Sequence, residues 1–370
     1  SRRLSPVSIG CVSHLFAWGQ DNAELWRQYP ELPPGVPIHV TGNPRNDLLR
    51  HEIQPYYEKE VSNIRKKYGD FILINTNFNH VNAFSPIRTL FLPADKPGEE
   101  PKFGRAARGM TREYAEGLRD LKQATFEHFQ EMIPALETAL VDATIVVRPH
   151  QVESKEVYRQ IAARCERDVT NEGNVVPWLM ACKVLIHNGC TTSVEAFAMG
   201  VPSVSYRATT NDDYDYGFYR LPNMLSHQCF NFEELVQTLK KILCGQLGVG
   251  DGEERQALID HYLAAQRGPL ACERIIDVLE KTSAELPNLP MPPLYDRLNG
   301  WRKATKRRVR RWSKLRKTDF NRSLAHQQNK YPEVPLGEVR ARVARFQQVL
   351  RDNHRLNVEQ FHHRLFRISA

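Results

Sequence analysis

The sequence predicts an α/β protein with a doubly wound parallel sheet of the Rossmann type. From about residue 71 onwards, apolar runs of four or five residues alternate with helical segments of ten to fifteen, which is typical of a parallel sheet with helices on both faces. Hydrophobic residues make up 41% of the 370 residues and charged residues 25%, which are ordinary values for a globular chain. No run approaches the roughly 20 apolar residues that a membrane-spanning helix needs.

The N-terminal residues predict two short strands. Segments 7–18 and 36–41 are apolar, and the second leads into Gly42-Asn43-Pro44. Both are typical of buried strands whose carboxyl ends open into loops. Residues 22–28 are expected to form a short helix between them.

A second series of elements begins with a helix at 58–68, which stops at Gly69. The run 71–78 is continuously apolar and turns polar at its end, as expected of a central parallel strand that leads to a ligand site. Residues 79–108 have no period and predict a long loop, a feature that is often functional. The elements expected after it are helix 111–140, strand 144–147, helices 153–164 and 175–182, strands 184–186 and 202–205, helices 232–243 and 253–279, and a final helix around Val339, Val343, Phe346 and Leu350.

The cysteine content and the charge distribution indicate the cellular compartment and the kind of partner. Seven cysteines, an odd number, are scattered through apolar segments, which indicates reduced thiols in a cytosolic protein. Ten basic side chains and no acidic one lie between residues 301 and 317, and without them the net charge of +8 becomes −2. A polyanionic partner is therefore expected to bind that segment.

Segment 187–202, HNGCTTSVEAFAMGVP, contains the strongest candidate site. A glycine at a strand end lets a ligand approach the backbone closely, and hydroxyl residues at a helix start offer hydroxyls and N–H groups to a phosphate. A glutamate one turn into the helix can accept hydrogen bonds from ribose hydroxyls. The alternative is a plain capped helix, because Thr and Ser are common caps. The candidate donor-binding residues here are Asn188, Gly189, Thr191, Thr192, Ser193 and Glu195.

Two other strand ends add candidates. Arg148 and His150 follow a predicted strand, where a cation and an imidazole can hold the phosphates of a donor; the alternative is a turn with a surface arginine. Asn75, Thr76 and Asn77 end the strand that begins near residue 71. We expect them to face the donor, although Asn and Thr are also common in turns.

Four strings carry a resemblance to a known family: residues 16–19 (FAWG), 41–47 (TGNPRND), 68–78 (YGDFILINTNF) and 187–200 (HNGCTTSVEAFAMG). In this order they resemble the bacterial surface carbohydrate biosynthesis protein family, over about residues 1–243. The resemblance implies a GT-B type glycosyltransferase of lipopolysaccharide or capsule assembly. The 187–200 string is similar to the donor-nucleotide site in the C-terminal half of such enzymes.

The resemblance also implies how the chain is divided. Family members carry roughly a hundred more N-terminal residues, most of a Rossmann-type half, including an acidic Glu-Glu-Gly stretch that is absent here. Residues 1–58 are therefore interpreted as a remnant of the N-terminal, acceptor-binding domain, and 59–284 as a complete nucleotide-sugar-binding domain. Residues 285–370 are interpreted as a helical extension with a Pro-rich linker, a basic segment and a C-terminal helix. The chain is expected to be an incomplete fragment.

The Arg-Pro-His turn at 148–150 and the hydroxyl cluster at 191–193 are together similar to motifs of bacterial sialyltransferases and Kdo transferases. Those enzymes hold CMP with a His-Pro motif and a Ser/Thr motif. The resemblance implies a CMP-sugar as one candidate donor. Gln151 lies at a position where those motifs vary, so the identity of the donor is not determined by this resemblance.

The catalytic residue is not identified, and its candidates are His14, Asp213 and Asp215. The two carboxylates follow the last predicted sheet strand and suit acid–base chemistry; the alternative is an acidic, solvated loop. Their spacing fits no defined metal loop, and no zinc-ligand spacing occurs. No metal and no cofactor are expected, with the nucleotide-sugar as substrate.

The basic segment 301–317 has apolar residues close to one face of a helix. Basic amphipathic helices with Trp lie on anionic membrane surfaces; the alternatives are a nucleic-acid-binding segment and an exposed charged linker. We predict membrane binding and no nucleic-acid partner. The candidate membrane-binding residues are Trp301, Arg307, Arg308, Arg311 and Trp312.

Together these features predict a cytoplasmic glycosyltransferase that is peripheral to the inner membrane. It would transfer a sugar from a nucleotide-sugar to a lipid-linked or growing surface glycan. The leaving phosphate would be stabilised by a helix N-terminus and by the residues that hold the donor, namely Arg148, His150, Thr191, Thr192 and Glu195. One alternative on the same fold is a non-hydrolysing UDP-sugar epimerase or a polyol-phosphate transferase, because fold does not determine function. The other is a non-catalytic module that binds polyanions or membranes.

Overall fold

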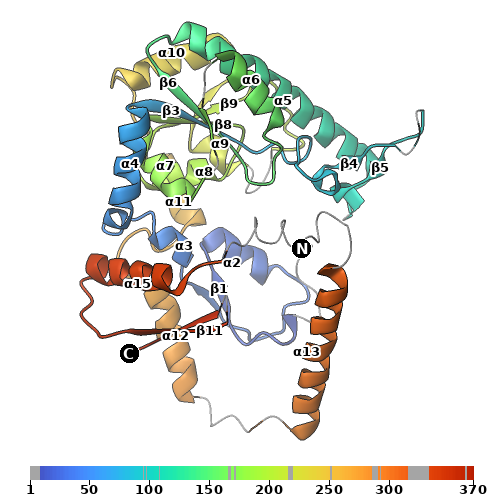
Figure 1. Ribbon diagram of the computed structural model, residues 1–370, viewed down its shortest axis with the longest axis vertical. Helices are drawn as coiled ribbons and strands as arrows, with labels where there is room; N and C mark the ends of the chain where they lie inside the picture. The colour runs from blue at the N-terminus through green and yellow to red at the C-terminus, as the bar shows by residue number, and fades with distance from the viewer. Residues whose placement is uncertain are drawn as a thin grey trace. The chain divides into compact units, whose positions relative to one another are not determined.

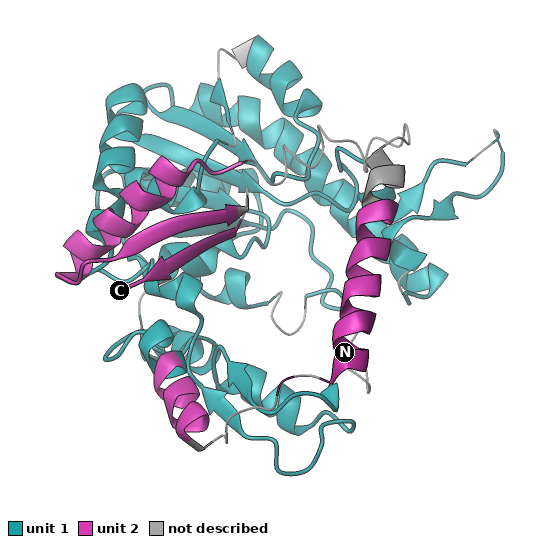
Figure 2. Ribbon diagram, turned by 60° about the horizontal axis from the view of Figure 1, so that its bottom comes forward, with its two compact units in different colours: residues 1–275 teal, residues 276–370 magenta. Residues whose placement is uncertain are grey.

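The structure, a computed structural model, describes residues 9–94, 96, 98–107, 109–165, 168–170, 172–215, 220–250, 252–285, 291, 293–315, 333–362 and 365–370. The chain divides into two compact units, residues 1–275 and residues 276–370 (Figure 2). The interpretation of 1–58, 59–284 and 285–370 as three parts remains a prediction.

Unit 1 is built around a six-stranded sheet in which every pairing is parallel, so the predicted doubly wound α/β fold is confirmed. The strand order is β10-β9-β8-β3-β6-β7. The strands are β3 (Phe71–Thr76), β6 (Thr144–Pro149), β7 (Asp168–Val169), β8 (Val184–His187), β9 (Ser203–Tyr206) and β10 (His227–Cys229).

Helices cover both faces of this sheet (Figure 1). One face is covered by α5 (Arg112–Ala139), α6 (Glu156–Cys165) and α10 (Phe232–Leu243). Alternate residues of the central strands, Ile72 and Ile74 among them, pack there against α5 side chains such as Phe129. The other face is covered by α4 (Glu58–Tyr68), α7 (Val175–Ala181) and α8 (Thr192–Ala198).

Short helices complete unit 1, among them η1 (Gln54–Tyr57) and α9 (Leu221–Met224). The single closing helix predicted at 253–279 is wrong: the structure has α11 (Glu253–Tyr262) and α12 (Ala271–Glu285). Helix α11 ends where Leu263 takes an extended backbone, with φ −127° and ψ 103°. Ala265 and Gly268, with φ +63° and +73°, and then Pro269 keep the segment before α12 out of a helical path.

The N-terminal part forms a small parallel sheet of β1 (Leu15–Ala17) and β2 (Ile38–Val40), with α2 (Gln20–Arg27) between the strands and α3 (Pro44–Asp47) after them. This part packs tightly on the loop between α11 and α12. A Cβ at Gly42, where φ is +90°, would lie 2.9 Å from the Ala264 carbonyl oxygen. Only glycine fits this close approach.

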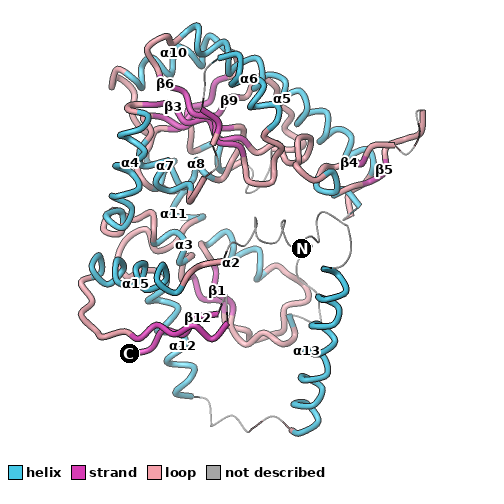
Figure 3. Tube along the Cα trace, in the orientation of Figure 1, coloured by secondary structure: helices cyan, strands magenta, loops and turns pink. Residues whose placement is uncertain are grey.

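The predicted loop 79–108 contains short elements, which Figure 3 shows leading out to a small hairpin. Leu90 and Ala106 are buried against Ala115 and Leu118 of α5, so the loop has its own small apolar cluster. Its elements are η2 (Pro86–Arg88), β4 (Phe91–Leu92), β5 (Lys102–Phe103) and η3 (Arg105–Ala107).

Beyond the end of α12, unit 2 contains α13 (Leu294–Leu315) and α15 (Leu336–Leu350). These helices are followed by an antiparallel hairpin of β11 (Asn357–His362) and β12 (Leu365–Ser369), which the sequence analysis did not predict. None of the helices in the described residues is long and apolar enough to cross a membrane.

Candidate functional site

Four buried polar side chains form one row across the carboxyl edge of the six-stranded sheet. Asn75 on β3 pairs in register with Arg148 on β6 and with His187 on β8, and His187 pairs with Ser205 on β9. Residues paired in register lie on the same face of a sheet. Asn75 lies on the same face as Phe71, whose ring contacts Trp178 of α7, so the four residues lie on the face that α7 covers. We call these four residues the polar row. It lies at the edge where such sheets bind ligands.

His187 holds the turn that follows β8. Its Nδ1 accepts hydrogen bonds from the N–H groups of Gly189 at 3.0 Å and Cys190 at 3.3 Å, and its Nε2 lies 2.8 Å from Ser226 Oγ. Complete burial lowers the pKa of His187 to about 3, so the ring is neutral at pH 7 with its proton on Nε2. Gly189 has φ +80°, which favours glycine at this turn. His187, absent from the predicted site, is therefore a positioning residue for it.

Arg148 lies buried beside this turn. Its Nη2 donates to the carbonyl oxygens of Gly173 at 2.8 Å and Glu172 at 3.2 Å. Burial lowers the pKa of Arg148 to about 10, while Glu195 lies close enough to oppose this shift. The guanidinium therefore remains a cation at pH 7 in a low-dielectric setting, where its attraction for an anion is strong.

Glu195 of α8 is ion-paired to a residue that the sequence analysis missed. Arg45 of α3 donates to Glu195 Oε1 from Nε at 3.1 Å and from Nη2 at 2.9 Å. The partners are 150 positions apart, so no local pattern in the sequence indicates the contact.

Five of the predicted residues carry a buried side-chain atom that lacks a hydrogen-bond partner in the described part of the chain. Buried polar atoms are nearly always satisfied in folded proteins, and leaving one unpaired costs about 1–3 kcal/mol. These five atoms therefore leave hydrogen-bonding capacity unused at this edge of the sheet. They are Asn75 Oδ1, Arg148 Nε, Asn188 Nδ2, Thr192 Oγ1 and Glu195 Oε2.

Hydrogen bonds of Asn188 and Asn77 connect this edge of the sheet to the long loop after β3. Asn188 Oδ1 accepts from the N–H of Asn77 at 3.0 Å, which ties the end of β3 to the end of β8. The Asn77 side chain accepts from Asn79, which in turn accepts from Arg105 of η3. The long loop is thus connected to the candidate site through Asn77.

Two predicted donor-binding residues have their hydroxyls engaged elsewhere. The buried Thr76 hydroxyl lies 3.1 Å from both carboxylate oxygens of Glu153, and Tyr158 donates to Glu153 Oε2 at 2.6 Å. Ser193 is fully buried and its hydroxyl lies 3.0 Å from the carbonyl oxygen of Cys190. Both hydroxyls thus have partners within the protein, and the donor-binding role of Thr76 and Ser193 stays a prediction. Thr191 remains exposed, and Thr192 is half-buried.

Glu153 was not predicted and has no local sequence signal. Burial raises its pKa, partly offset by the Tyr158 hydroxyl. Its Oε1 accepts from the N–H of His150 at 3.1 Å, so Glu153 fixes the turn that carries His150. That imidazole is partly exposed, and its Nδ1 accepts from the N–H of Val152 at 3.3 Å. The buried part of the ring and the nearby Arg148 lower the pKa of His150, which leaves a neutral ring with Nε2–H as a donor.

The catalytic candidates do not meet at one point. Asp215 is ion-paired to Arg207 at 2.6 Å and accepts from Asn223 at 3.2 Å, which is a structural role at the end of β9. Asp213 is exposed in a turn. His14 lies before β1 and its ring stacks on His39 with centroids 5.2 Å apart. No one of the three is distinguished as the catalytic residue.

The candidate membrane residues belong to α13. Trp301 is 71% exposed, and Arg307 and Arg308 are exposed on the same helix. The side chains of Arg311 and Trp312 lie outside the described residues. In the described part of the chain, no group of three or more His, Cys, Asp or Glu residues is placed to hold a metal ion.

The fold and the site thus define an α/β protein with a row of buried polar side chains at the carboxyl edge of a parallel sheet. No protein-family model matches the sequence, and no curated protein matches it.

Several solved structures are similar in fold. A variant of the wall teichoic acid polymerase TagF soaked with CDPG is 15% identical with a TM-score of 0.45, covering 76% of this chain and 58% of that one. The UDP-GlcNAc 2-epimerase of Methanocaldococcus jannaschii, in complex with UDP-GlcNAc and UDP, is 14% identical with a TM-score of 0.39, covering 73% and 61%. The MnaA–UDP structure from S. aureus is 16% identical with a TM-score of 0.40, covering 76% and 62%. The chain spans about three fifths of the length of these proteins.

Proposed function

We propose that this protein is a glycosyltransferase that transfers a sugar from a nucleotide-sugar donor to a bacterial surface polysaccharide, of the lipopolysaccharide or capsule type. The observation that carries the proposal is the set of unpaired buried atoms of five residues, Asn75, Arg148, Asn188, Thr192 and Glu195. They combine hydrogen-bond donors, a cation and a carboxylate, which is the chemistry that a nucleoside phosphate needs.

Each group has a proposed role. Arg148 and the Nε2–H of His150 hold the donor phosphates, and Thr191 and Thr192 add hydroxyls. Glu195 accepts from the ribose. As the bond to the sugar breaks, negative charge grows on the leaving phosphate, and a fixed, partly desolvated arginine stabilises that charge more than water does. The residues that line the site are Asn75, Asn77, Asn188 and Gly189.

Calorimetric titration with CMP, CDP, UDP and GDP tests this proposal. We expect one nucleotide to bind selectively, with a CMP-sugar as the favoured donor class. The variant Arg148→Ala should weaken binding by about tenfold or more, the usual loss of a hydrogen bond to a charged group. Lys66→Ala removes an exposed charge on α4 and should leave affinity unchanged. If none of the four nucleotides binds the wild-type chain, the proposal is wrong.

The reaction type needs its own measurement. Incubating the chain with the sugar-linked form of the bound nucleotide and no acceptor should leave the sugar configuration unchanged. Epimerisation of a UDP-sugar under these conditions would instead identify the epimerase alternative. Nucleotide binding with no transfer to a lipid-linked or growing glycan acceptor would favour a non-catalytic module.

We also propose that α13 binds the anionic surface of the inner membrane from the cytoplasm, which would bring the enzyme to a lipid-linked acceptor. Leu294, Leu298, Trp301 and Val309 recur at helical spacing and are all at least 59% exposed. Asp296 is the one acidic residue of this helix, which is otherwise rich in Arg and Lys. A charged helix with an apolar stripe suits the boundary between headgroups and acyl chains.

Cosedimentation with vesicles tests the membrane proposal. Vesicles that contain phosphatidylglycerol should retain the protein, and pure phosphatidylcholine vesicles should retain much less, because each basic residue near an anionic surface adds about 1 kcal/mol. Replacing Arg307 and Arg308 by Gln should weaken retention. Equal retention on both vesicle types, or binding to duplex RNA with equal affinity, would contradict a membrane-specific role.

A further inference from the structure

Arg45 connects the N-terminal part of unit 1 to the candidate site. Both its Nε and its Nη2 donate to the same atom, Glu195 Oε1, at 3.1 and 2.9 Å. Glu195 is largely buried, with 14% of its side chain exposed, whereas the Arg45 side chain is 58% exposed. The exposed Arg45 side chain therefore holds the mostly buried Glu195 carboxylate in place from the solvent side.

The backbone around Arg45 is built to hold this contact. Asn43 caps the first turn of α3 by accepting from the Arg45 N–H at 3.1 Å, and Pro44 occupies the first helical position. A proline there has its φ already set for a helix. Gly42 packs its backbone against the Ala264 carbonyl with no room for a side chain. The conformation that directs Arg45 at Glu195 is thus fixed over residues 42–45.

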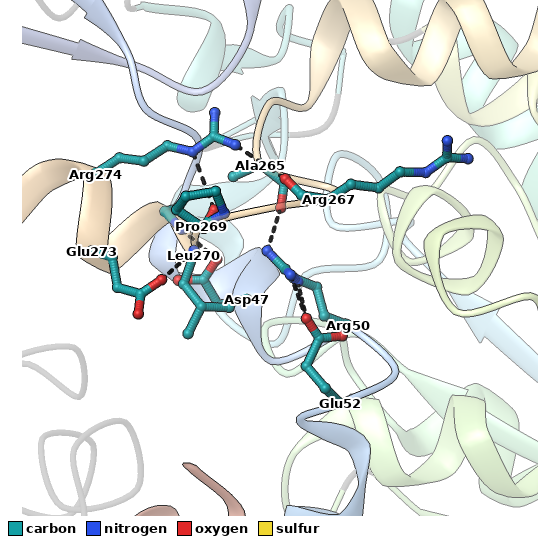
Figure 4. Close-up of polar contacts among 10 residues, drawn as sticks. Asp47, Arg50, Glu52, Ala265, Arg267, Pro269, Leu270, Glu273 and Arg274 are labelled. Atoms are coloured by element: carbon teal, nitrogen blue, oxygen red, sulfur yellow. Dashed lines mark hydrogen bonds and ion pairs between the residues drawn. The ribbon is translucent and has the colours of Figure 1, made fainter. Parts of the chain in front are cut away.

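Polar contacts then brace α3 against the start of α12 (Figure 4). The buried Asp47 accepts from the N–H groups of Ala271 at 2.8 Å and Cys272 at 3.0 Å, which caps α12. Arg50 donates to the Ala265 carbonyl at 3.2 Å and is paired with Glu52. These contacts hold α3 in place, so the position of Arg45 does not depend on the ion pair alone.

Glu195 keeps unused acceptor capacity after Arg45 is satisfied. A carboxylate offers about four acceptor positions, and Arg45 fills two of them on Oε1. Oε2 is buried and has no hydrogen-bond partner in the described part of the chain. A vicinal diol supplies two hydroxyl donors. A ribose has such a diol at its 2′ and 3′ positions, whereas a 2′-deoxyribose lacks the 2′-hydroxyl and therefore has no diol.

We propose that Arg45 is a positioning and specificity-determining residue of the nucleotide site, which holds the Glu195 carboxylate so that it recognises the 2′,3′-diol of a ribonucleotide. The inference rests on the proposed function and adds the discrimination between ribose and deoxyribose. Arg45 acts through Glu195 and makes no contact with the phosphates. Loss of Arg45 should therefore change the ratio of the affinities for ribonucleotide and deoxyribonucleotide, and should not change the electrostatic attraction of the site for phosphates.

Affinities for CMP and 2′-deoxy-CMP, and for UDP and 2′-deoxy-UDP, measured by calorimetry, test this assignment. The wild-type chain should bind the ribonucleotide roughly tenfold to hundredfold more tightly than the deoxy form, the range for a hydrogen bond to a charged group. Arg45→Ala should bring this ratio close to one while leaving the deoxynucleotide affinity unchanged. Arg45→Lys keeps the charge without the two-point contact and should give an intermediate ratio.

Controls separate this role from its alternatives. Arg27→Ala removes an exposed arginine of α2 and should leave the ratio unchanged. Adding Arg45→Ala to Glu195→Ala should cause no further loss, because Arg45 acts through the carboxylate; a further loss would mean a direct phosphate contact and would overturn the assignment. Retention of the wild-type ratio by Arg45→Ala, folded by circular dichroism, would also overturn it. Failure of the wild-type chain to bind any nucleotide would reject the proposed function itself.

Discussion

The six-stranded sheet of unit 1 and helix α13 of unit 2 use the same kinds of side chain in opposite ways. In the sheet, apolar residues such as Ile72 and Ile74 are fully buried against α5. In α13, Leu298 and Trp301 are 64% and 71% exposed. The difference shows that apolar residues stabilise the fold in the first region, whereas in the second they are available to a partner. Substitutions in the two regions should therefore affect different measurements.

The largest effect on stability is expected in the sheet core. Phe129 is fully buried, with its ring 5.3 Å from that of Phe78 and 5.7 Å from that of Tyr206. Phe129→Ala should lower the free energy of unfolding by about 3–5 kcal/mol, because it removes buried apolar surface and leaves a cavity. Urea denaturation measures this. A loss below about 1 kcal/mol would mean that the core packs differently.

The next effect is a loss of stability in acid caused by His187. Its folded-state pKa of about 3 lies below its ordinary value of 6.5, so the unfolded chain binds this proton more readily. Its contribution to stability is complete above pH 6.5 and falls by about 1.4 kcal/mol per pH unit between pH 6.5 and 3. The lowered pKa of His80, about 4, acts in the same direction, whereas the raised pKa of Glu153 opposes it.

Urea denaturation at pH 7 and pH 5 checks the role of His187. The wild-type chain should lose about 2 kcal/mol from this residue over that interval. His187→Gln should be less stable at pH 7 and should lose correspondingly less on acidification. Equal losses in both proteins would show that His187 is not buried in its neutral form.

A smaller effect is expected where Asp47 caps α12. Asp47→Ala leaves two backbone N–H groups without their acceptor, and loss of a helix cap costs about 1–2 kcal/mol. Asp47→Asn keeps one acceptor oxygen and should recover part of the loss. Thermal unfolding followed by circular dichroism compares the two variants; equal stability of Asp47→Ala and wild type would exclude the cap.

The smallest effect on stability is expected in α13. Leu298→Ala combined with Trp301→Ala should change the free energy of unfolding by less than about 0.5 kcal/mol, since exposed residues contribute little. The same double variant should lose most of its retention on phosphatidylglycerol vesicles. A large loss of stability would show that this face of α13 is covered by another part of the protein.

The sequence alone was sufficient to predict the central strands. The runs around Ile72, Ile145 and Leu185 are continuously apolar because both faces of these strands are covered. The edge strands β7 and β10 were missed, because two or three residues such as Asp168–Val169 carry no apolar run. The hairpin of β11 and β12 was missed because its segments lack both a strong alternation and a turn signal.

Those residues of the candidate site that lie at the ends of apolar strands could be predicted from the sequence, and those that depend on distant contacts could not. Asn75, Arg148 and Asn188 directly follow or end apolar runs, so their place at the carboxyl edge follows from the topology of a parallel sheet. The contacts of Arg45 and Glu153 depend on residues far away in the sequence, namely Glu195 and Thr76. Such contacts are set by tertiary packing and leave no local pattern.

The polar row also constrains how this protein can vary. Because Asn75 pairs with both Arg148 and His187, a one-residue insertion inside β3 would turn its side chain to the opposite face and place an apolar residue in the row. Insertions in the loop after β3 shift no register. Length variation among natural or engineered versions should therefore be tolerated in that loop and be nearly absent within the central strands.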